Sequence, residues 1–148
     1  MSTDEHLREI EEFFHQKIPL TAAMGIRVES YDGEQLVLTA PLEINHNHLG
    51  TAFGGSLGAL AMLAGYGLVW LMFDGNEGHV VVRDASISFR QPVRGELRAV
   101  CRLPDEADVE AFKSKFQSDG SARIHLAVAL EEGHRVAATF EGTFVAMK

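Results

Sequence analysis

The chain has 148 residues, of which 46% are hydrophobic, so it can form one domain with its own core. Its formal net charge of -8 argues against a partner held through nucleic-acid phosphates, because such binding needs a basic surface. The single cysteine, Cys101, excludes an intrachain disulfide and a cysteine-based metal knuckle. We therefore expect a one-domain protein of a reducing compartment that binds no nucleic acid.

The N-terminal segment predicts an amphipathic helix over residues 1–18. Apolar residues from Leu7 to Phe14 recur at helical spacing, and acidic residues lie in the early turns. The segment lacks the basic start and the apolar run of a secretory signal. It therefore favours a cytoplasmic location.

Six strands are predicted from β-branched and aromatic runs bounded by turn residues. The expected strands are 26–31, 35–40, 80–89, 97–103, 122–131 and 135–147. The first two flank Asp32-Gly33, a strong hairpin signal. The acidic piece 105–115 is expected to be a short helix. No repeat or linker interrupts this order, which predicts a single domain over 1–148.

Residues 50–73 carry no charged side chain and are numerous enough to span a bilayer. Five glycines over 54–67, several alanines and the absence of flanking Lys or Arg argue against a membrane helix. A helix that is apolar on all sides must otherwise be enclosed by protein. We expect one long central helix over 54–73, enclosed by a curved antiparallel sheet in an α+β fold.

The runs NHNHLGTAFGGSLGALAMLAG and VVRDASISFRQPVRGEL resemble the hot-dog thioesterase superfamily over nearly the whole chain. The stretch from Asn47 to Ser56, followed by Val82-Arg83-Asp84-Ala85, is most similar to the YiiD C-terminal thioesterase family. The resemblance implies a hot-dog fold and hydrolysis of an acyl-CoA or acyl-carrier-protein thioester by water. It also implies a homodimer or a dimer of dimers, with coenzyme A only as part of the substrate and no separate cofactor.

The resemblance implies a catalytic centre at the start of the central helix. Asn47, seven residues before Gly54, matches a side chain that holds the water or the thioester, and Gly54 or Gly55 offers an N–H to the carbonyl. The first turn of any helix has unsatisfied donors and a positive dipole end, which stabilise an oxyanion. Tight helix packing is the alternative role for these glycines. The further candidates for substrate binding are His48, Phe53, Ser56, Tyr66, Arg90 and Arg94.

Two positions depart from the best-known hot-dog pattern. Phe53 replaces the histidine of His-Gly-Gly, and Met62 stands where many members carry the acidic base. Asp84 is then the nearest acidic candidate for the base, on the strand that meets its twin in hot-dog dimers. Strand alternation, however, places Asp84 on the face opposite Ala85 and Ile87, and so away from the helix.

Other motifs do not fit their usual contexts. Ser56 satisfies G-x-S-x-G, but no buried parallel strand precedes it, which argues against a serine nucleophile. His46 and His48 lack further ligands at a recognisable spacing, so we expect no metal. Because the helix has no acid, a non-catalytic acyl-CoA sensor is an alternative function. An acyl hydratase or dehydratase is a weaker one, because its Asp and His pair is not found.

Overall fold

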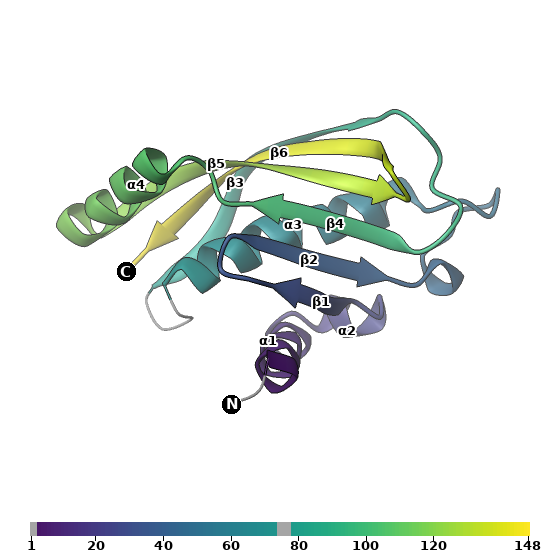
Figure 1. Cartoon of the computed structure of the whole chain (residues 1–148), viewed down its shortest axis with the longest axis horizontal. Helices are drawn as coiled ribbons and strands as arrows, with labels where there is room; N and C mark the ends of the chain where they lie inside the picture. Colours follow the sequence, from purple (N-terminus) through teal and green to yellow (C-terminus); the bar gives the residue numbers. More distant parts are fainter. Residues whose placement is uncertain (1–2, 74–77) are drawn as a thin grey trace.

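The computed structural model describes residues 3–73 and 78–148, in the α+β arrangement predicted from the sequence (Figure 1). The helices are α1 (Thr3–Lys17), α2 (Pro19–Ala23), η1 (Leu42–Ile44), α3 (Gly54–Met72) and α4 (Glu106–Asp119). The strands are β1 (Arg27–Tyr31), β2 (Gln35–Ala40), β3 (His79–Phe89), β4 (Leu97–Arg102), β5 (Ser121–Glu132) and β6 (Arg135–Met147).

The strands form one antiparallel sheet in the order β1-β2-β4-β5-β6-β3. The sheet curls over α3, and β3 lies at one of its two edges (Figure 1). The central helix predicted over 54–73 is confirmed, with Phe73 as its C-cap. By length and composition α3 could cross a membrane, but 56% of its apolar window is buried inside the protein. Burial of this kind is typical of the core helix of a soluble domain.

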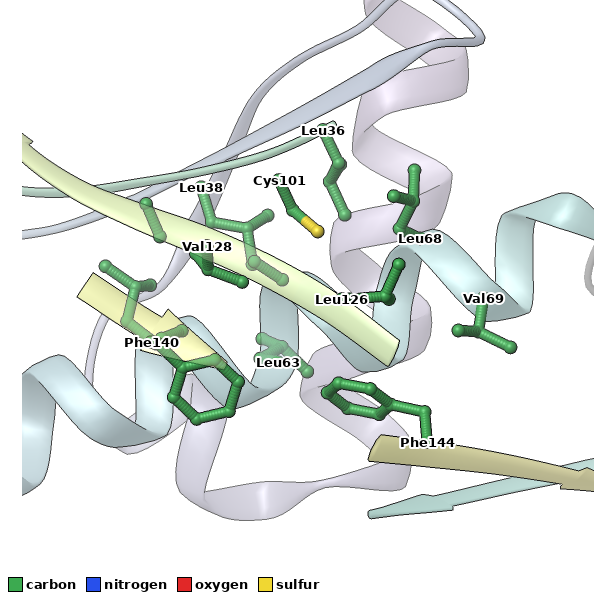
Figure 2. Close-up of a cluster of buried hydrophobic side chains, with 14 of the residues drawn as sticks. Leu36, Leu38, Leu63, Leu68, Val69, Cys101, Leu126, Val128, Phe140 and Phe144 are labelled. Atoms are coloured by element: carbon green, nitrogen blue, oxygen red, sulfur yellow. The ribbon is translucent and has the colours of Figure 1, made fainter. Parts of the chain in front are cut away.

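The core lies between α3 and the inner face of the sheet. Figure 2 shows Leu63, Leu68 and Val69 of α3 among side chains from four strands. These partners are Leu36, Leu38, Cys101, Leu126, Val128, Phe140 and Phe144. A Cβ added at Gly65 would lie 2.3 Å from Cζ of Phe144, and one at Gly67 would lie 2.7 Å from Cζ of Phe14. Both glycines therefore permit close approach of aromatic rings to the helix axis.

Helix α1 packs against the sheet at β1 and against α3. Phe14 is fully buried, and Oε1 of Glu11 accepts a hydrogen bond from the Val28 amide at 2.9 Å. The N-terminal helix is confirmed from Thr3, while residues 1–2 of the predicted range lie outside the described residues. It ends at Lys17, and the short helix α2 begins at Pro19, a favourable first-turn residue that the sequence analysis did not use.

The predicted helix over 105–115 is too short. Helix α4 continues to Asp119 and is terminated by Gly120, whose φ of +79° is a left-handed C-cap conformation. Its buried residues Val109, Phe112 and Phe116 hold it against the protein. The six predicted strands match the observed ones to within one residue at each end.

Candidate functional site at the start of the central helix

The first turn of α3 presents unsatisfied backbone donors. The amides of Ser56 and Leu57 both donate to the Phe53 carbonyl, at 3.0 and 3.1 Å. The amides of Gly54 and Gly55 have no acceptor among the residues that the structure describes. Two N–H groups at the positive end of a helix dipole can therefore meet an oxygen that gains negative charge.

The loop before α3 is held by its own hydrogen bonds. Phe53 donates its amide to the Asn45 carbonyl at 2.8 Å, and Ala52 donates to Val93 at 2.8 Å. The buried Asn45 amide nitrogen donates to the carbonyls of Met24 and Pro41 at 2.9 and 2.8 Å. The start of α3 is thereby fixed to the rest of the fold.

The Asn47 side chain closes a turn inside this loop. Its Oδ1 accepts the amides of Leu49 at 2.8 Å and Thr51 at 3.2 Å, and its Nδ2 donates to Oγ1 of Thr51 at 2.9 Å. Both oxygen lone pairs are therefore engaged, whereas Nδ2 keeps a second hydrogen. In this geometry Asn47 offers a donor to a ligand and not a base to a water.

A depression of about 360 Å³ joins this loop to the end of β3. One side comes from the loop and α3, and the other from the turn after β3. Its lining residues are Asn47, Thr51, Ala52, Gly54, Leu57, Phe89, Arg90, Gln91, Pro92 and Val93. The structure thus brings together Asn47, Gly54 and Arg90 of the predicted site.

Four predicted site residues lie around the depression without lining it. Phe53 is 56% exposed, and its ring lies so close to Gly55 that an added Cβ there would be 2.4 Å from the ring. Ser56 is half-buried on the first turn, and His48 is exposed at the loop tip. The Phe53 ring therefore lies against Gly55, which itself remains exposed.

Tyr66 and Arg94 lie apart from the depression. Tyr66 is half-buried three turns along α3, where desolvation raises the pKa of its phenol. The Arg94 amide donates to Oε2 of Glu132 at 2.7 Å, in the turn between β3 and β4. Arg98, on β4 after this turn, is paired with Glu29 and with Glu131. Arg90 and Arg94 form no ion pair among the described residues.

Asp84 lies on the exposed strand β3 and does not line the depression. A bulge falls between Val82 and Asp84, after which Asp84 pairs with Thr143 and Ala85 with Gly142. Asp84 consequently shares the outer face of the sheet with Ser86, as strand alternation predicts. No carboxylate from the part of the chain that the structure describes lines the depression.

The sequence analysis missed two polar lining residues. Thr51 lies four residues after Asn47 and completes its turn, a spacing that could have indicated the contact. Gln91 carries no such signal, because it is placed by the turn after β3. Among residues 3–73 and 78–148, no three His, Cys, Asp or Glu side chains gather as a metal site.

A second, larger hollow of about 800 Å³ lies on the outer face of the sheet. Ser86, His125, Ala127, Thr139 and Glu141 are among its lining residues. It contains neither the start of α3 nor the Asn47 loop. The chemistry described above therefore belongs to the smaller depression.

Comparison with known proteins supports the same assignment. Residues 7–148 match the family model described as "Putative thioesterase (yiiD_Cterm)". A protein of unknown function from Chlorobaculum tepidum TLS has a similar structure, with a TM-score of 0.90 and 35% identity over 99% of this chain and 97% of that one. A "putative thioesterase" from Shewanella oneidensis has a TM-score of 0.88 and 31% identity over 98% and 99% of the two chains. A "probable thioesterase" from Pseudomonas aeruginosa has a TM-score of 0.83 and 25% identity over 95% and 94%.

Proposed function

We propose a function from the premise that the chain belongs to the YiiD C-terminal family of hot-dog thioesterases. In this proposal the protein hydrolyses acyl thioesters of coenzyme A or of an acyl-carrier protein at the start of α3. The observation that carries this proposal is the pair of unsatisfied Gly54 and Gly55 amides beside the depression that Asn47 lines. Donors at such a position favour the tetrahedral oxyanion over the ground-state carbonyl.

In the proposed reaction the oxygen of a water attacks the thioester carbonyl carbon. The carbonyl π electrons move to the oxygen, which is stabilised by the helix amides and by the remaining hydrogen of Asn47 Nδ2. When the carbonyl re-forms, the C–S bond breaks and the thiolate takes up the proton that the water lost. The products are a carboxylic acid and a free thiol.

The base that accepts the water proton comes from outside the depression of this protomer. A second copy is the source we propose, because β3 is an open edge of eleven residues with apolar Val82 and Phe89 exposed. Arg83 and Asp84 lie side by side near the middle of this strand, so antiparallel pairing with a twin would bring opposite charges together. Asp84→Asn tests whether this carboxylate acts as the base in the dimer.

Arg90 is the group we assign to the coenzyme A phosphates. It lines the depression and has no ion pair among the described residues, whereas Arg98 is held by two glutamates. A guanidinium binds phosphate oxygens through two parallel hydrogen bonds. Arg94, in the same turn, is a second candidate.

We propose that the protein is cytoplasmic and binds its thioester substrate from aqueous solution.

The acyl chain then runs along the uncovered face of α3 towards Tyr66. Ala59, Met62 and Tyr66 are half-buried there, and no described residue lies within 4 Å of a Cβ added at Gly58. Tight packing of α3 against Phe144 of the sheet explains Gly65, and packing against Phe14 of α1 and Leu36 of the sheet explains Gly67, but neither explains Gly58.

A non-catalytic acyl-CoA sensor is the second candidate function, because no described residue brings a carboxylate into the depression. A panel of acyl-CoA thioesters with a free-thiol readout, run beside a calorimetric binding titration, separates the two. Thiol release with turnover supports hydrolysis. Binding without thiol release establishes the sensor. Addition of water across an acyl double bond identifies a hydratase, and loss of water to form that bond identifies a dehydratase, in both cases with the thioester intact.

A further inference from the structure

A chain of side-chain hydrogen bonds ends at the depression beside the start of α3. Nη2 of Arg135 donates to Oε1 of Glu132 at 3.0 Å, and Nη1 of Arg135 donates to Oε1 of Gln91 at 3.2 Å. Glu132 and Arg135 belong to the hairpin between β5 and β6, whereas Gln91 lies in the turn after β3 and lines the depression. The hairpin therefore reaches the site through the Arg135 side chain.

The contact with Arg135 determines how the Gln91 side-chain amide is turned. A guanidinium has donors only, so the Gln91 atom that faces it is the oxygen. The Nε2 group of Gln91 then points away from Arg135, and it has no acceptor among the residues that the structure describes. Because Gln91 is exposed and lines the depression, it offers N–H donors to a ligand there.

The backbone of this turn is fixed on both sides of the Gln91 side chain. The amides of Arg90 and Gln91 both donate to the Ala137 carbonyl, at 2.9 and 3.0 Å. Further along the turn, the Val93 carbonyl accepts the Ala52 amide at 2.8 Å. This last bond joins the turn to the loop that precedes α3. Gln91 is therefore held in a set position relative to the first turn of the helix.

Resting on the proposed function, we infer that Gln91 binds the pantetheine amide nearest the thioester sulfur, and that Arg135 orients Gln91 for this contact. Coenzyme A and acyl-carrier protein both present their acyl groups on a pantetheine arm. With the thioester carbonyl at the Gly54 and Gly55 amides and the acyl chain along α3, the sulfur side of the substrate occupies the depression. The carbonyl oxygen of the pantetheine amide is an acceptor that suits the Nε2 donor. Gln91 then contributes to specificity for the leaving group, and Arg135 is a positioning residue.

Two model thioesters of one acyl group test this contact. The N-acetylcysteamine thioester carries the amide nearest the sulfur, whereas the S-pentyl thioester replaces that amide by methylenes at the same chain length. Gln91→Leu should lower kcat/KM on the N-acetylcysteamine thioester by about threefold to tenfold, the loss expected for one hydrogen bond, and should not lower it on the S-pentyl thioester. Each variant is compared with the unmodified protein on the same thioester, so the different reactivities of the two thiols cancel.

A second pair of variants tests the positioning role of Arg135. Arg135→Ala removes the group that holds the Gln91 oxygen, so the Gln91 amide can turn. We expect kcat/KM on the N-acetylcysteamine thioester to fall by about twofold to threefold, with the S-pentyl value unchanged. Arg123→Ala, which shortens another exposed arginine on the neighbouring strand β5 outside the depression, should change neither value. A general distortion of the turn would instead lower kcat/KM on both thioesters.

An equal loss on both thioesters in folded Gln91→Leu, or a loss on neither, would overturn the contact. A loss seen only with acyl-CoA would assign Gln91 to the phosphates, and hydrolysis of acyl-CoA but of neither model thioester would place recognition beyond this amide; both results overturn the inference. Equal effects of Arg135→Ala and Arg123→Ala would overturn the positioning role. If the unmodified protein hydrolyses no thioester at all, the proposed function itself fails, whereas failure of the inference alone leaves that hydrolysis intact.

Discussion

The enclosed central helix predicts opposite effects for one substitution at two of its glycines. Gly65→Ala and Gly58→Ala both replace glycine by alanine inside α3, which stabilises a helix by about 0.8–1 kcal/mol. At Gly65 the new Cβ would lie 2.3 Å from Cζ and 2.6 Å from Cε2 of the fully buried Phe144. At Gly58 no atom of the described residues lies within 4 Å of the new Cβ.

Overpacking a core typically costs about 1–3 kcal/mol, and the Phe144 ring cannot move into solvent. Net of the helix term, we expect Gly65→Ala to lower the free energy of unfolding by up to about 2 kcal/mol, whereas Gly58→Ala raises it by about 1 kcal/mol. Urea unfolding at one fixed protein concentration measures both, with equal m-values required for the comparison. A stable Gly65→Ala would refute the packing of α3 on β6, and a destabilised Gly58→Ala would refute open space at Gly58.

Three further predictions concern other parts of the fold. Asn45→Ala leaves the carbonyls of Met24 and Pro41 without their donor and should lower the unfolding free energy by about 1–3 kcal/mol, measured by denaturant titration. An unchanged midpoint would contradict a stabilising role for these two hydrogen bonds. Burial raises the pKa of the Cys101 thiol to about 12 from an ordinary 9.0, so the unfolding free energy should be retained below pH 9.0 and fall towards pH 12, where only the unfolded thiol ionises. Cys101→Ala should lose this pH dependence, and a thiol reagent that titrates Cys101 in the native protein at pH 8 would contradict its burial. Arg83→Glu should weaken a dimer paired through β3, and the combined Arg83→Glu/Asp84→Arg exchange should restore the dimer, as measured by light scattering. Equal association of the unmodified protein and both variants would exclude strand pairing near Arg83 and Asp84.

The main elements could be predicted from the sequence because each has a strong local signal. The uncharged run before Phe73 requires a helix surrounded by protein. The alternation of polar and apolar residues after Asp84 indicates which face of β3 carries the Asp84 side chain. Helix α2 was missed because five residues give no periodicity. Helix α4 was cut short although Phe116 continues the helical spacing of Val109 and Phe112. The end of α4 is determined by Gly120, a helix-terminating glycine that the sequence prediction overlooked.

The site was harder to predict because it depends on contacts between loops. The resemblance placed Asn47 near Gly54, and the depression does join them. What the sequence did not indicate is that Oδ1 of Asn47 is occupied by two amides, which leaves the side chain a donor. The bulge before Asp84 was also beyond reach, since a bulge depends on the register with β6.

Turnover of an Asn47→Ala variant beside Thr51→Val tests the central claim most directly. Both variants break the hydrogen bond from Asn47 Nδ2 to Thr51 Oγ1, but only the first removes the amide that faces the depression. If Asn47 contributes to the oxyanion site, Asn47→Ala should lower kcat on the best acyl thioester by about a hundredfold to a thousandfold, whereas Thr51→Val should lower it by less than about tenfold. Equal losses in both variants would show that Asn47 only stabilises the loop. Wild-type kcat in a folded Asn47→Ala variant would contradict a catalytic centre at the start of α3.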